Sequence, residues 1–457
     1  MGKIRYIITL WITKVIAKML RLVAKERGTN LPGSIAIKLC PNFLSYFKMP
    51  EKVIAVTGSN GKTSTTHFIN QMLEGVGYTV ISNKAGSNMA PGIATTLLTN
   101  SSLTGKTKGN IAVFEVDERG SSAVYSYITP TYLVCTNLFR DSIMRNGHSE
   151  FIKAKIEEKL PQSTTLILNA DDLISGTIGE NNKKIYYAVD RVDKLDEKSN
   201  KNNLSIDISS CPECLAKLEY EYLHYHHIGK AKCTECNFTS PKADFIGTNV
   251  NMENGTFVLK EDKKETEYTF NVSELFNVYN IVATITLARI LNIDEEKIKE
   301  EVKKLSLKLS RKDEEIVNGK RIVKMLSKDQ NPISCSRAMD FVSVSDKTKA
   351  VVLIIMNFKG KQDECEDVSW LYDTDFEYLK QDSVKQIIIG GKRALDILVR
   401  LEMAGIDRNI IDIDMEVDNI PKMLKKDEVE EVYILHSLYA ATKAKNIKQE
   451  IIKKIEG

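Results

Sequence analysis

Residues 53–66 read Val-Ile-Ala-Val-Thr-Gly-Ser-Asn-Gly-Lys-Thr-Ser-Thr-Thr, and this segment constrains the fold more than any other part of the chain. The order predicts a buried strand, a glycine turn and the first turn of a helix, which together form a cradle for nucleotide phosphates. Gly58 and Gly61 let backbone N–H groups close around phosphate oxygens. Lys62 supplies charge to the β and γ phosphates, and the Thr63 hydroxyl is placed to hold Mg²⁺. We therefore predict an α/β protein that uses ATP.

The cradle follows a short form of the phosphate-binding motif. The general motif has its first glycine where this chain has Val56, so the match is to Thr-Gly-x-Asn-Gly-Lys-Thr. Thr57, Asn60 and Ser64 complete the candidate nucleotide-binding residues of this loop. The alternative is an ordinary glycine turn in which Gly-Lys-Thr occurs by chance, and the apolar strand before the turn argues against it.

Length and charge limit the remaining possibilities. A chain of 457 residues is too long for one hydrophobic core and predicts two or three domains. The formal net charge is +3 with 27% charged residues, so no overall field favours a nucleic acid or an anionic lipid as partner. Eight cysteines in so long a chain do not resemble a secreted disulfide framework. We expect a reducing cytoplasmic location and small-molecule or protein partners.

The N-terminal segment predicts an amphipathic helix. Its apolar residues recur at helical spacing: Ile8, Trp11, Ile12, Val15 and Met19. Lys14, Lys18 and Arg21 interrupt the apolar run, and a membrane span needs about 20 apolar residues, so we do not expect this helix to cross a membrane. Two roles remain open for it, which are packing on the next domain and association with a membrane surface.

From residue 50 to about residue 190, short apolar runs alternate with helical stretches, as a parallel α/β sheet requires. The candidate strands are Val53–Thr57, Thr79–Ser82, Ile111–Val116, Tyr132–Thr136, Thr165–Leu168 and Ile185–Val189. Ligands of such sheets bind at the carboxyl ends of the strands. Glu115 and Asp117 follow one strand, and Asn137 and Asp141 follow another, so we place them near the phosphate cradle. A carboxylate there, Glu115 above all, is a candidate Mg²⁺ ligand together with Thr63.

An insertion at about residues 205–243 carries a metal-binding pattern. Cys211 and Cys214 form one Cys-x-x-Cys pair, and Cys233 and Cys236 form a second pair after 18 intervening residues. This spacing predicts a four-cysteine zinc ribbon, and four protein ligands leave no open position, so the Zn²⁺ is structural. Three histidines lie between the pairs, and we expect surface histidines there rather than ligands: His224, His226 and His227. Basic residues are not clustered enough to favour nucleic-acid binding.

Two further regions follow the insertion. Residues 274–291 predict a helix with Asn277 and Asn280 on one face, where both side chains can address one ligand. From about residue 300, strands at 321–326, 351–356, 386–389 and 432–435 alternate with helices at 393–403 and 438–447. These elements predict a second, smaller α/β domain.

Together these motifs resemble the Mur ligase family, which activates a carboxylate as an acyl phosphate at the expense of ATP and lets an amine attack it. The resemblance implies a Mur-ligase central domain at residues 49–305 after a lead-in at residues 1–48, and a C-terminal domain at residues 306–457. It also implies an Asn-x-x-x-Asp element at Asn137 and Asp141, and a hinge variant at residues 310–314. The nucleotide-side residues that it implies are those of the phosphate loop, with Asn277, Asn280 and Arg311.

A narrower resemblance is to the MurT branch of this family, because the chain has no large N-terminal substrate domain before the ATP loop and carries a zinc ribbon and an Asp-Val-Ser-Trp segment. It implies a ligase subunit that amidates the α-carboxylate of D-glutamate in the stem peptide of lipid II. Ammonia would come from a GatD-type class I glutaminase in a heterodimer. Asp367 would then complete the partner's Cys–His–Asp triad, with Asp373 in reserve. The implied location is cytoplasmic, at the inner face of the membrane.

Two other functions stay open on the sequence alone. One is a Mur-like or folylpolyglutamate-like ligase that adds an amino acid and binds it in its own C-terminal domain. The other is an inactive scaffold whose ATP site is only structural. Dependence of ATP turnover on a free amino acid distinguishes the first alternative, and the lack of turnover under every condition distinguishes the second.

Overall fold

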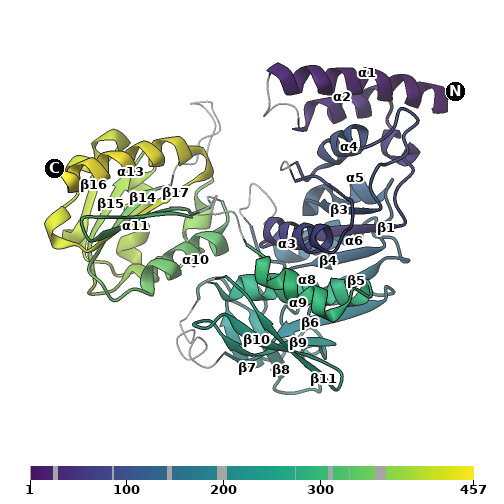
Figure 1. Cartoon of the computed structure of the whole chain (residues 1–457). Helices are drawn as coiled ribbons and strands as arrows, with labels where there is room; N and C mark the ends of the chain where they lie inside the picture. The colour runs from purple at the N-terminus through teal and green to yellow at the C-terminus, as the bar shows by residue number, and fades with distance from the viewer. Residues whose placement is uncertain are drawn as a thin grey trace. The chain divides into compact units, whose positions relative to one another are not determined.

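A computed structural model describes residues 2–23, 29–84, 87–141, 147–192, 203–272, 274–306, 312–328, 330–355 and 367–457. The chain divides into two compact units (Figure 1). The first unit comprises residues 1–139, 149–201 and 207–307. The second comprises residues 308–457 together with the short segments 140–148 and 202–206. Each unit has its own sheet and its own hydrophobic core.

A nine-stranded sheet in the order β11-β10-β9-β6-β5-β4-β1-β3-β2 forms the centre of the first unit. All neighbours from β2 through β9 are parallel, and β9, β10 and β11 form an antiparallel edge. The strands are β1 Lys52–Thr57, β2 Val80–Ser82, β3 Ile111–Glu115, β4 Tyr132–Cys135, β5 Thr165–Asn169, β6 Lys184–Val189, β9 Phe245–Asn251, β10 Thr256–Glu261 and β11 Lys264–Thr269. β2 and β3 lie on one side of β1, and β4, β5 and β6 follow on the other side. The strand order therefore reverses at β1. Such a switch point is where α/β sheets bind ligands.

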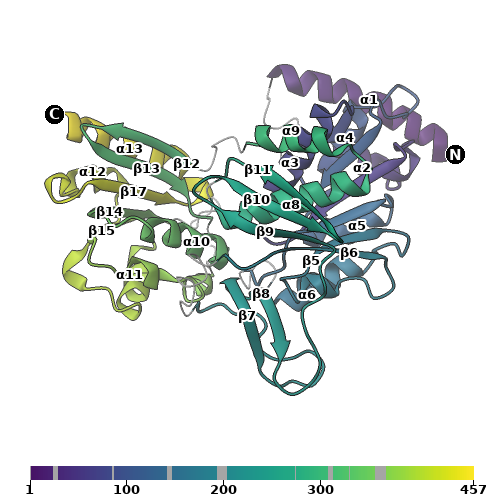
Figure 2. The same cartoon turned by 60° about the horizontal axis from the view of Figure 1, so that its bottom comes forward.

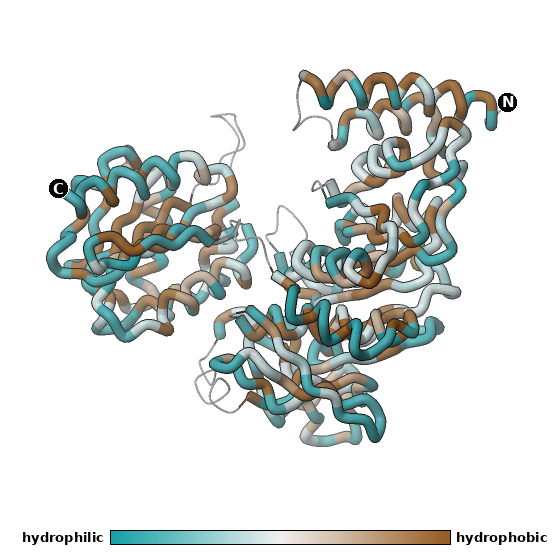
Figure 3. Tube along the Cα trace, in the orientation of Figure 1, coloured by the Kyte–Doolittle hydropathy of each residue, from teal (hydrophilic) through white to brown (hydrophobic). Residues whose placement is uncertain are grey.

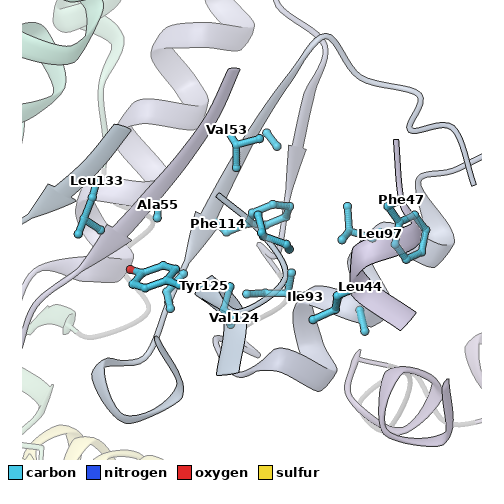
Figure 4. Close-up of a cluster of buried hydrophobic side chains, with 14 of the residues drawn as sticks. Leu44, Phe47, Val53, Ala55, Ile93, Leu97, Phe114, Val124, Tyr125 and Leu133 are labelled. Atoms are coloured by element: carbon cyan, nitrogen blue, oxygen red, sulfur yellow. The ribbon is translucent and has the colours of Figure 1, made fainter. Parts of the chain in front are cut away.

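Helices cover both faces of this sheet. They are α1 Gly2–Val23, α2 Leu31–Leu39, α3 Lys62–Gly75, α4 Ala90–Thr99, α5 Ser121–Tyr125, α6 Ser149–Glu157, α8 Leu275–Ile290 and α9 Glu295–Lys304. Alternate residues of a strand point to opposite faces, so Val53, Ala55 and Phe114 face a core that also contains Ile93 and Leu97 of α4 (Figure 4). On the other face lie α3 and α8, and α8 is buried along most of its length.

A small antiparallel hairpin, β7 Leu218–Tyr225 and β8 Ile228–Cys233, projects from the first unit (Figure 2). The four cysteines lie at the end where β7 begins and β8 ends. The turn of the hairpin, at residues 226 and 227, lies at the opposite end. Its core is small and includes Leu173, Leu218 and Ala231 beside two of the cysteines.

The second unit contains a six-stranded sheet in the order β12-β13-β17-β14-β15-β16, parallel except for the β12–β13 pair. Its strands are β12 Lys312–Val317, β13 Lys320–Leu326, β14 Lys349–Ile354, β15 Val384–Gly390, β16 Ile411–Asp414 and β17 Glu431–His436. Its helices are α10 Pro332–Ser343, α11 Ala394–Met403, α12 Ile420–Met423 and α13 Ala441–Glu456. Apolar clusters on both faces of the sheet bury β14 completely.

The predicted fold class is confirmed: a parallel α/β sheet with an inserted four-cysteine module precedes a second α/β unit. The ten strands predicted from the sequence are all present, with ends that differ by at most two residues. The antiparallel strands β9, β10 and β11 were not predicted, because their alternation of polar and apolar residues is short and each strand is half exposed.

Candidate functional site

The phosphate loop joins the carboxyl end of β1 to α3, which begins at Lys62. Gly58 has φ +129°, and a Cβ there would lie 2.2 Å from Thr136 Oγ1 and 2.9 Å from the Asn137 carbonyl oxygen. Gly61 has φ +86°, and a Cβ there would lie 2.8 Å from Asn280 Oδ1. Both positions therefore require glycine, for its backbone freedom and for its lack of a side chain. The loop keeps the N-terminus of α3 open to an anion.

Hydrogen bonds from the end of β4 hold the loop in shape. The Ser59 N–H donates to the Asn137 carbonyl at 2.7 Å, and the Asn60 N–H donates to Asn137 Oδ1 at 3.0 Å. Thr136 Oγ1 donates to the Asn60 carbonyl at 2.6 Å. Ser59 Oγ accepts from the Phe139 N–H at 2.9 Å. The loop is thus shaped by residues almost 80 positions away along the chain.

Lys62 is buried, and its ammonium group lies between the loop and a carboxylate. Lys62 Nζ donates to the Gly58 carbonyl and to Glu118 Oε1, the latter at 2.8 Å. The side chains of Lys62 and Glu118 are 9% and 3% exposed. Glu118 was not among the predicted site residues, because it follows β3 in a short 3-10 turn rather than ending the strand. Its place directly after Glu115 and Asp117, as the third acidic residue at the end of this strand, was the signal for it in the sequence.

The predicted Mg²⁺ ligands fit a cation in part. Thr63 is exposed at the first turn of α3, and Glu115 is half-buried and accepts a hydrogen bond from Asn88 Nδ2 at 3.1 Å. Asp117 accepts from the Arg119 N–H at 3.1 Å and caps the 3-10 turn. Glu118 Oε2 is buried and has no hydrogen-bond partner among the described residues. Hydroxyl and carboxylate oxygens are the donors that Mg²⁺ prefers, so Thr63, Glu115 and Glu118 have donors of the right kind.

Asn277 and Asn280 lie one turn apart on α8 and face the start of α3. Asn280 Oδ1 accepts from Thr65 Oγ1 at 3.0 Å, and Asn280 Nδ2 donates to Asn277 Oδ1 at 3.2 Å. Asn277 Nδ2 donates to Glu274 Oε2 at 2.8 Å. Thus Asn280 contacts the helix of the phosphate loop directly, and Asn277 holds Asn280. Arg311, another predicted nucleotide-side residue, lies outside the described residues.

The four predicted metal ligands come together at one end of the β7–β8 hairpin. Their sulfur atoms all lie within 4.8 Å of one another, with Cys211 Sγ 3.6 Å from Cys236 Sγ and Cys214 Sγ 3.4 Å from Cys233 Sγ. A Zn–S bond of about 2.3 Å in a tetrahedron places neighbouring sulfurs roughly 3.8 Å apart. The Glu235 N–H donates to Cys233 Sγ at 3.3 Å and lowers the pKa of the Cys233 thiol to about 6. The ligand type, number and spacing fit a closed, structural Zn²⁺ site.

The prediction of surface histidines on the hairpin was wrong. His224, His226 and His227 are 4%, 1% and 0% exposed. The turn of the hairpin packs inward against the main sheet, and the ring of His227 lies 4.4 Å from the ring of Phe139. His227 Nε2 also lies 3.3 Å from Asp172 Oδ1. The sequence does not reveal this packing, because a turn between two polar strands usually faces solvent.

Two adjacent aspartates connect the hairpin to the sheet. Asp172 Oδ2 accepts from the Leu138 N–H at 2.7 Å, within the segment that holds the phosphate loop. Asp171 accepts from the Tyr222 hydroxyl at 2.9 Å and from the Tyr279 hydroxyl at 2.6 Å. Burial raises the pKa of the Asp171 carboxyl, and these hydrogen bonds oppose the rise. The hairpin, α8 and the phosphate loop therefore share one buried polar network.

In the second unit, Asp367 lies beside a short 3-10 turn. Its Oδ1 accepts from the Ser369 N–H at 2.9 Å, which is a capping arrangement at the start of that turn. Asp373 forms an ion pair with Arg140, with Oδ1 and Nη1 3.3 Å apart. Asp375 is buried and accepts from the Leu204 N–H at 2.7 Å. Of the three aspartates, Asp367 has the most local backbone contact, and Asp373 and Asp375 are bound by residues distant in sequence.

Comparison with known sequence families gives two matches. Residues 56–213 match the Mur ligase middle domain, and residues 328–441 match the MurT ligase C-terminal domain. The first match begins inside β1 and contains the whole phosphate loop, and the second contains Asp367. A parallel sheet with this loop at its carboxyl edge, followed by a second α/β unit, defines a ligase of the Mur type.

Two curated relatives match nearly the whole chain. The lipid II isoglutaminyl synthase (glutamine-hydrolyzing) subunit MurT of Staphylococcus aureus strain COL is 30% identical over 407 residues, which are 88% of this chain and 89% of that protein. The subunit of the same name from Streptococcus pneumoniae is 31% identical over 415 residues, which are 90% of each chain. The chain belongs to the MurT family of Mur ligases.

Solved structures share the fold at low sequence identity. The pseudomurein peptide ligase type C from Methanothermus fervidus has a TM-score of 0.64 at 20% identity and covers 90% of this chain and 81% of its own. MurF from Acinetobacter baumannii has a TM-score of 0.63 at 14% identity and covers 92% and 80%. At such identities the likeness concerns the arrangement of the elements alone.

Proposed function

We propose that this chain is the ATP-using subunit of a glutamine-dependent amide ligase. It converts the α-carboxylate of D-glutamate in the stem peptide of lipid II into an amide, through an acyl phosphate. A GatD-type class I glutaminase supplies the ammonia and forms a heterodimer with the chain. We place the reaction in the cytoplasm, at the inner face of the membrane, because lipid II is anchored there by its lipid.

One observation carries this proposal: the chain matches subunits named lipid II isoglutaminyl synthase (glutamine-hydrolyzing) over about nine-tenths of its length, through both units. The phosphate loop supports it, since an acyl phosphate requires a bound nucleotide. We assign nucleotide binding to residues 49–305 and docking of the glutaminase to residues 306–457. We also propose that the four cysteines bind a structural Zn²⁺.

The phosphate site suggests how the first step proceeds. The substrate carboxylate attacks the γ phosphorus of ATP, the bond between that phosphorus and the bridging oxygen breaks, and ADP leaves. Lys62 neutralises the charge that develops on the phosphate oxygens, and the N–H groups of the loop orient them. Mg²⁺, when bound by Thr63 and by Glu115 or Glu118, adds positive charge at the same phosphates.

The second step explains why such a chain needs a partner. Ammonia attacks the acyl carbonyl, and phosphate leaves with its bonding electron pair. Water competes with ammonia in this step, and hydrolysis of the acyl phosphate would waste ATP, so the site has to exclude water. Ammonia produced by a bound glutaminase reaches the carbonyl without equilibrating with the solvent.

Reconstitution tests the proposal. The chain is combined with the glutaminase from the same cell and supplied with lipid II, ATP and either glutamine or ammonium, and the product is identified by mass spectrometry. When the glutaminase is present, we expect amidated lipid II with either glutamine or ammonium. When the glutaminase is absent, we expect the product with ammonium but not with glutamine. Addition of an amino acid in place of the amide would support the amino-acid ligase instead.

Asp367→Asn tests the docking half of the proposal. If Asp367 orients the histidine of the partner's triad, its replacement lowers glutamine-dependent amidation by up to about 10⁴-fold and leaves ammonium-dependent amidation unchanged. Asp373→Asn is the comparison, because Asp373 already binds Arg140. Equal loss with glutamine and ammonium would assign Asp367 to the ligase site or to the fold. The glutamine-specific loss at Asp373 alone would move the triad role to that residue.

A further inference from the structure

Helix α1, Gly2–Val23, has two apolar sides, and only one of them is covered by the protein. Tyr6, Leu10 and Ala17 are at most 3% exposed and belong to the core of the first unit. They pack α1 on α2 and α4. Tyr6 stacks on Tyr46 with ring centroids 5.0 Å apart, and Thr13 is fully buried on the same side. The helix is therefore fixed to the unit by its inner side.

The outer side of α1 is apolar as well. Seven large apolar residues there are 46–82% exposed: Ile4, Ile8, Trp11, Ile12, Val15, Met19 and Leu22. We call them the α1 stripe. Trp11 and Ile12 are neighbours in the sequence, and the other members follow one another at steps of three or four residues, so the seven lie along one side of the helix from end to end. Figure 3 shows the brown, hydrophobic residues that recur along α1. Exposed apolar surface of this extent and continuity marks a contact surface rather than ordinary exposure.

The charges of α1 are all positive. Lys3, Arg5, Lys18 and Arg21 are exposed, and residues 2–23 contain no aspartate or glutamate. Two of the basic side chains of α1 also bind the protein: Lys14 Nζ donates inward to the carbonyl oxygens of Leu98 and Ser101, and Arg5 Nε donates to the Leu39 carbonyl. On the helical projection, Lys3, Lys18 and Arg21 lie along one border of the α1 stripe and Arg5 lies along the other.

The loop that follows α4 extends this surface. Trp11 Nε1 donates to the Leu103 carbonyl at 2.9 Å, so the indole is anchored at its polar atom while its ring stays half exposed. Leu103 is itself 63% exposed, and the same loop carries the exposed lysines 106 and 108. Tryptophan is enriched at membrane interfaces, and the exposed ring of Trp11 offers such an interface apolar surface.

These features select one kind of partner. Among the described residues, no helix is long and apolar enough to cross a membrane. A second copy of the chain would bring two sets of basic residues together, and like charges oppose such a contact. An anionic lipid surface matches both the apolar stripe and the basic borders, because acyl chains accept the former and head groups pair with the latter.

We propose that the α1 stripe is a membrane-contact surface that lies flat in the interface of an anionic bilayer. The stripe enters the boundary between head groups and acyl chains, and Lys3, Arg5, Lys18 and Arg21 contact the head groups. The inference rests on the proposed function only for its biological purpose, which is to hold the ligase at the surface that carries its lipid-linked substrate. The binding itself requires neither ATP nor the glutaminase.

Sedimentation with lipid vesicles tests this surface without any catalytic step. The full chain is mixed with vesicles of phosphatidylcholine that contain phosphatidylglycerol, and with vesicles of phosphatidylcholine alone. We expect binding to the anionic vesicles that weakens as salt is raised, and much weaker binding to the neutral ones. Retention at high salt and on neutral vesicles would contradict the basic borders, and no binding to either kind would overturn the proposal.

A matched pair of double variants gives the specific readout. Ile8 and Ile12 are 52% and 46% exposed, and Leu395 and Val399 on α11 are 53% and 46% exposed with the same spacing. Ile8→Gln with Ile12→Gln removes two apolar groups from the stripe, and Leu395→Gln with Val399→Gln is the control. We expect at least about a tenfold loss of vesicle binding for the first variant and none for the control. Circular dichroism verifies that both variants fold.

The outcomes separate this inference from the proposed function. The Ile8 and Ile12 variant should amidate a water-soluble substrate analogue at the normal rate, and it should lose activity only toward lipid-linked substrate in vesicles. Vesicle binding without any amidation would leave the stripe valid and the proposed function wrong. Equal vesicle binding by both variants would overturn the proposal that the α1 stripe is the membrane-contact surface. Concentration-dependent dimers that disappear in the Ile8 and Ile12 variant would assign it to a second copy and overturn the membrane partner.

Discussion

The phosphate loop and the four-cysteine cluster are both short motifs in the sequence, but the chain supports them in different ways. The loop is held by residues of β4, α8 and the turn after β3, which are distant in sequence. The cysteines are held by their own two knuckles and by a small core, and Cys214 is exposed. The loop keeps its shape through hydrogen bonds of the protein itself, whereas the cluster gathers four thiols whose ionised forms repel one another unless a metal binds them.

Because of this difference, we expect variants of the loop to change the chemical step and variants of the cysteine cluster to change folding. A side chain removed from the loop removes charge at the phosphates, while the many backbone hydrogen bonds of the loop remain. If the cluster binds a structural Zn²⁺ as proposed, removal of one cysteine should leave the nucleotide chemistry unchanged and weaken the folding of the hairpin. The four predictions below test that separation, from the largest expected effect to the smallest.

Lys62→Ala should have the largest effect on rate. If Lys62 neutralises charge on the transferred phosphate as proposed, the loss of its ammonium group should lower ATP turnover by on the order of 10²–10³-fold. Lys84→Ala is the matched control, because Lys84 pairs with Glu74 at the surface of the same unit. Steady-state ATP hydrolysis measures both variants, and thermal unfolding checks their stability. Normal turnover by Lys62→Ala would refute the assignment of the loop.

Glu118→Gln should have the next largest effect. It compares the carboxylate found in the structure with the one predicted from the sequence. Glu118 binds Lys62, whereas Glu115 is the carboxylate that the sequence places at the Mg²⁺. We expect Glu118→Gln to lower turnover by about 10²-fold and to raise the Mg²⁺ concentration that gives half-maximal rate. Glu115→Gln is measured in parallel. If only Glu115→Gln changes the Mg²⁺ dependence, Glu118 serves to position Lys62. Glu118→Asp provides a second variant if the glutamine variant does not fold.

Removal of the metal should change folding rather than chemistry. We expect one Zn²⁺ per chain by elemental analysis, and Cys211→Ser should lower both the metal content and the melting temperature. Structural zinc contributes on the order of 10–16 kcal/mol to small domains of this kind, so the hairpin should lose its protection against hydrogen exchange. The rate of ATP turnover at saturating ATP should stay within a factor of about two, because a closed tetrahedral site offers no position for substrate. Protein purified without chelators and free of zinc would contradict the site.

The two motifs also differ in how much of their surroundings the sequence predicted. The positions of Gly58, Lys62 and the cysteines follow from residue type and spacing, since the strand before the loop and the knuckles around the metal are local structures. Glu118 and the inward-facing His227 did not follow. Glu118 reaches its place through the ion pair with Lys62, and His227 through its contacts with Phe139 and Asp172, so both depend on distant parts of the chain. The pairing of Asn137 with Asn60 falls between these cases, because the strand ends predicted proximity but not the hydrogen bonds.

The smallest expected effect concerns the contact between the two regions. The ring of Phe139 packs on His227 of the hairpin, and the Phe139 backbone N–H donates to Ser59 of the loop, so Phe139 connects the hairpin to the phosphate loop. Phe139→Leu should raise the KM for ATP by a few-fold and leave kcat nearly unchanged. This rise in KM corresponds to a loss of about 1 kcal/mol or slightly more in the free energy of ATP binding. Phe257→Leu is the control, because Phe257 is equally buried in β10 and stacks on Tyr268 instead.

The double variant Phe139→Leu with Cys211→Ser decides whether the regions are independent. Suppose that the hairpin stabilises the loop only through the ring of Phe139. In that case Cys211→Ser already removes this contact, and the effects of the two single variants on KM should not add. A coupling of about 0.5 kcal/mol or more, measured as a double-mutant cycle in KM, would mean that the metal site braces the nucleotide site from a distance. Additive effects would show that the ribbon is a separate module attached to the sheet. In that case the buried histidines serve its anchorage alone.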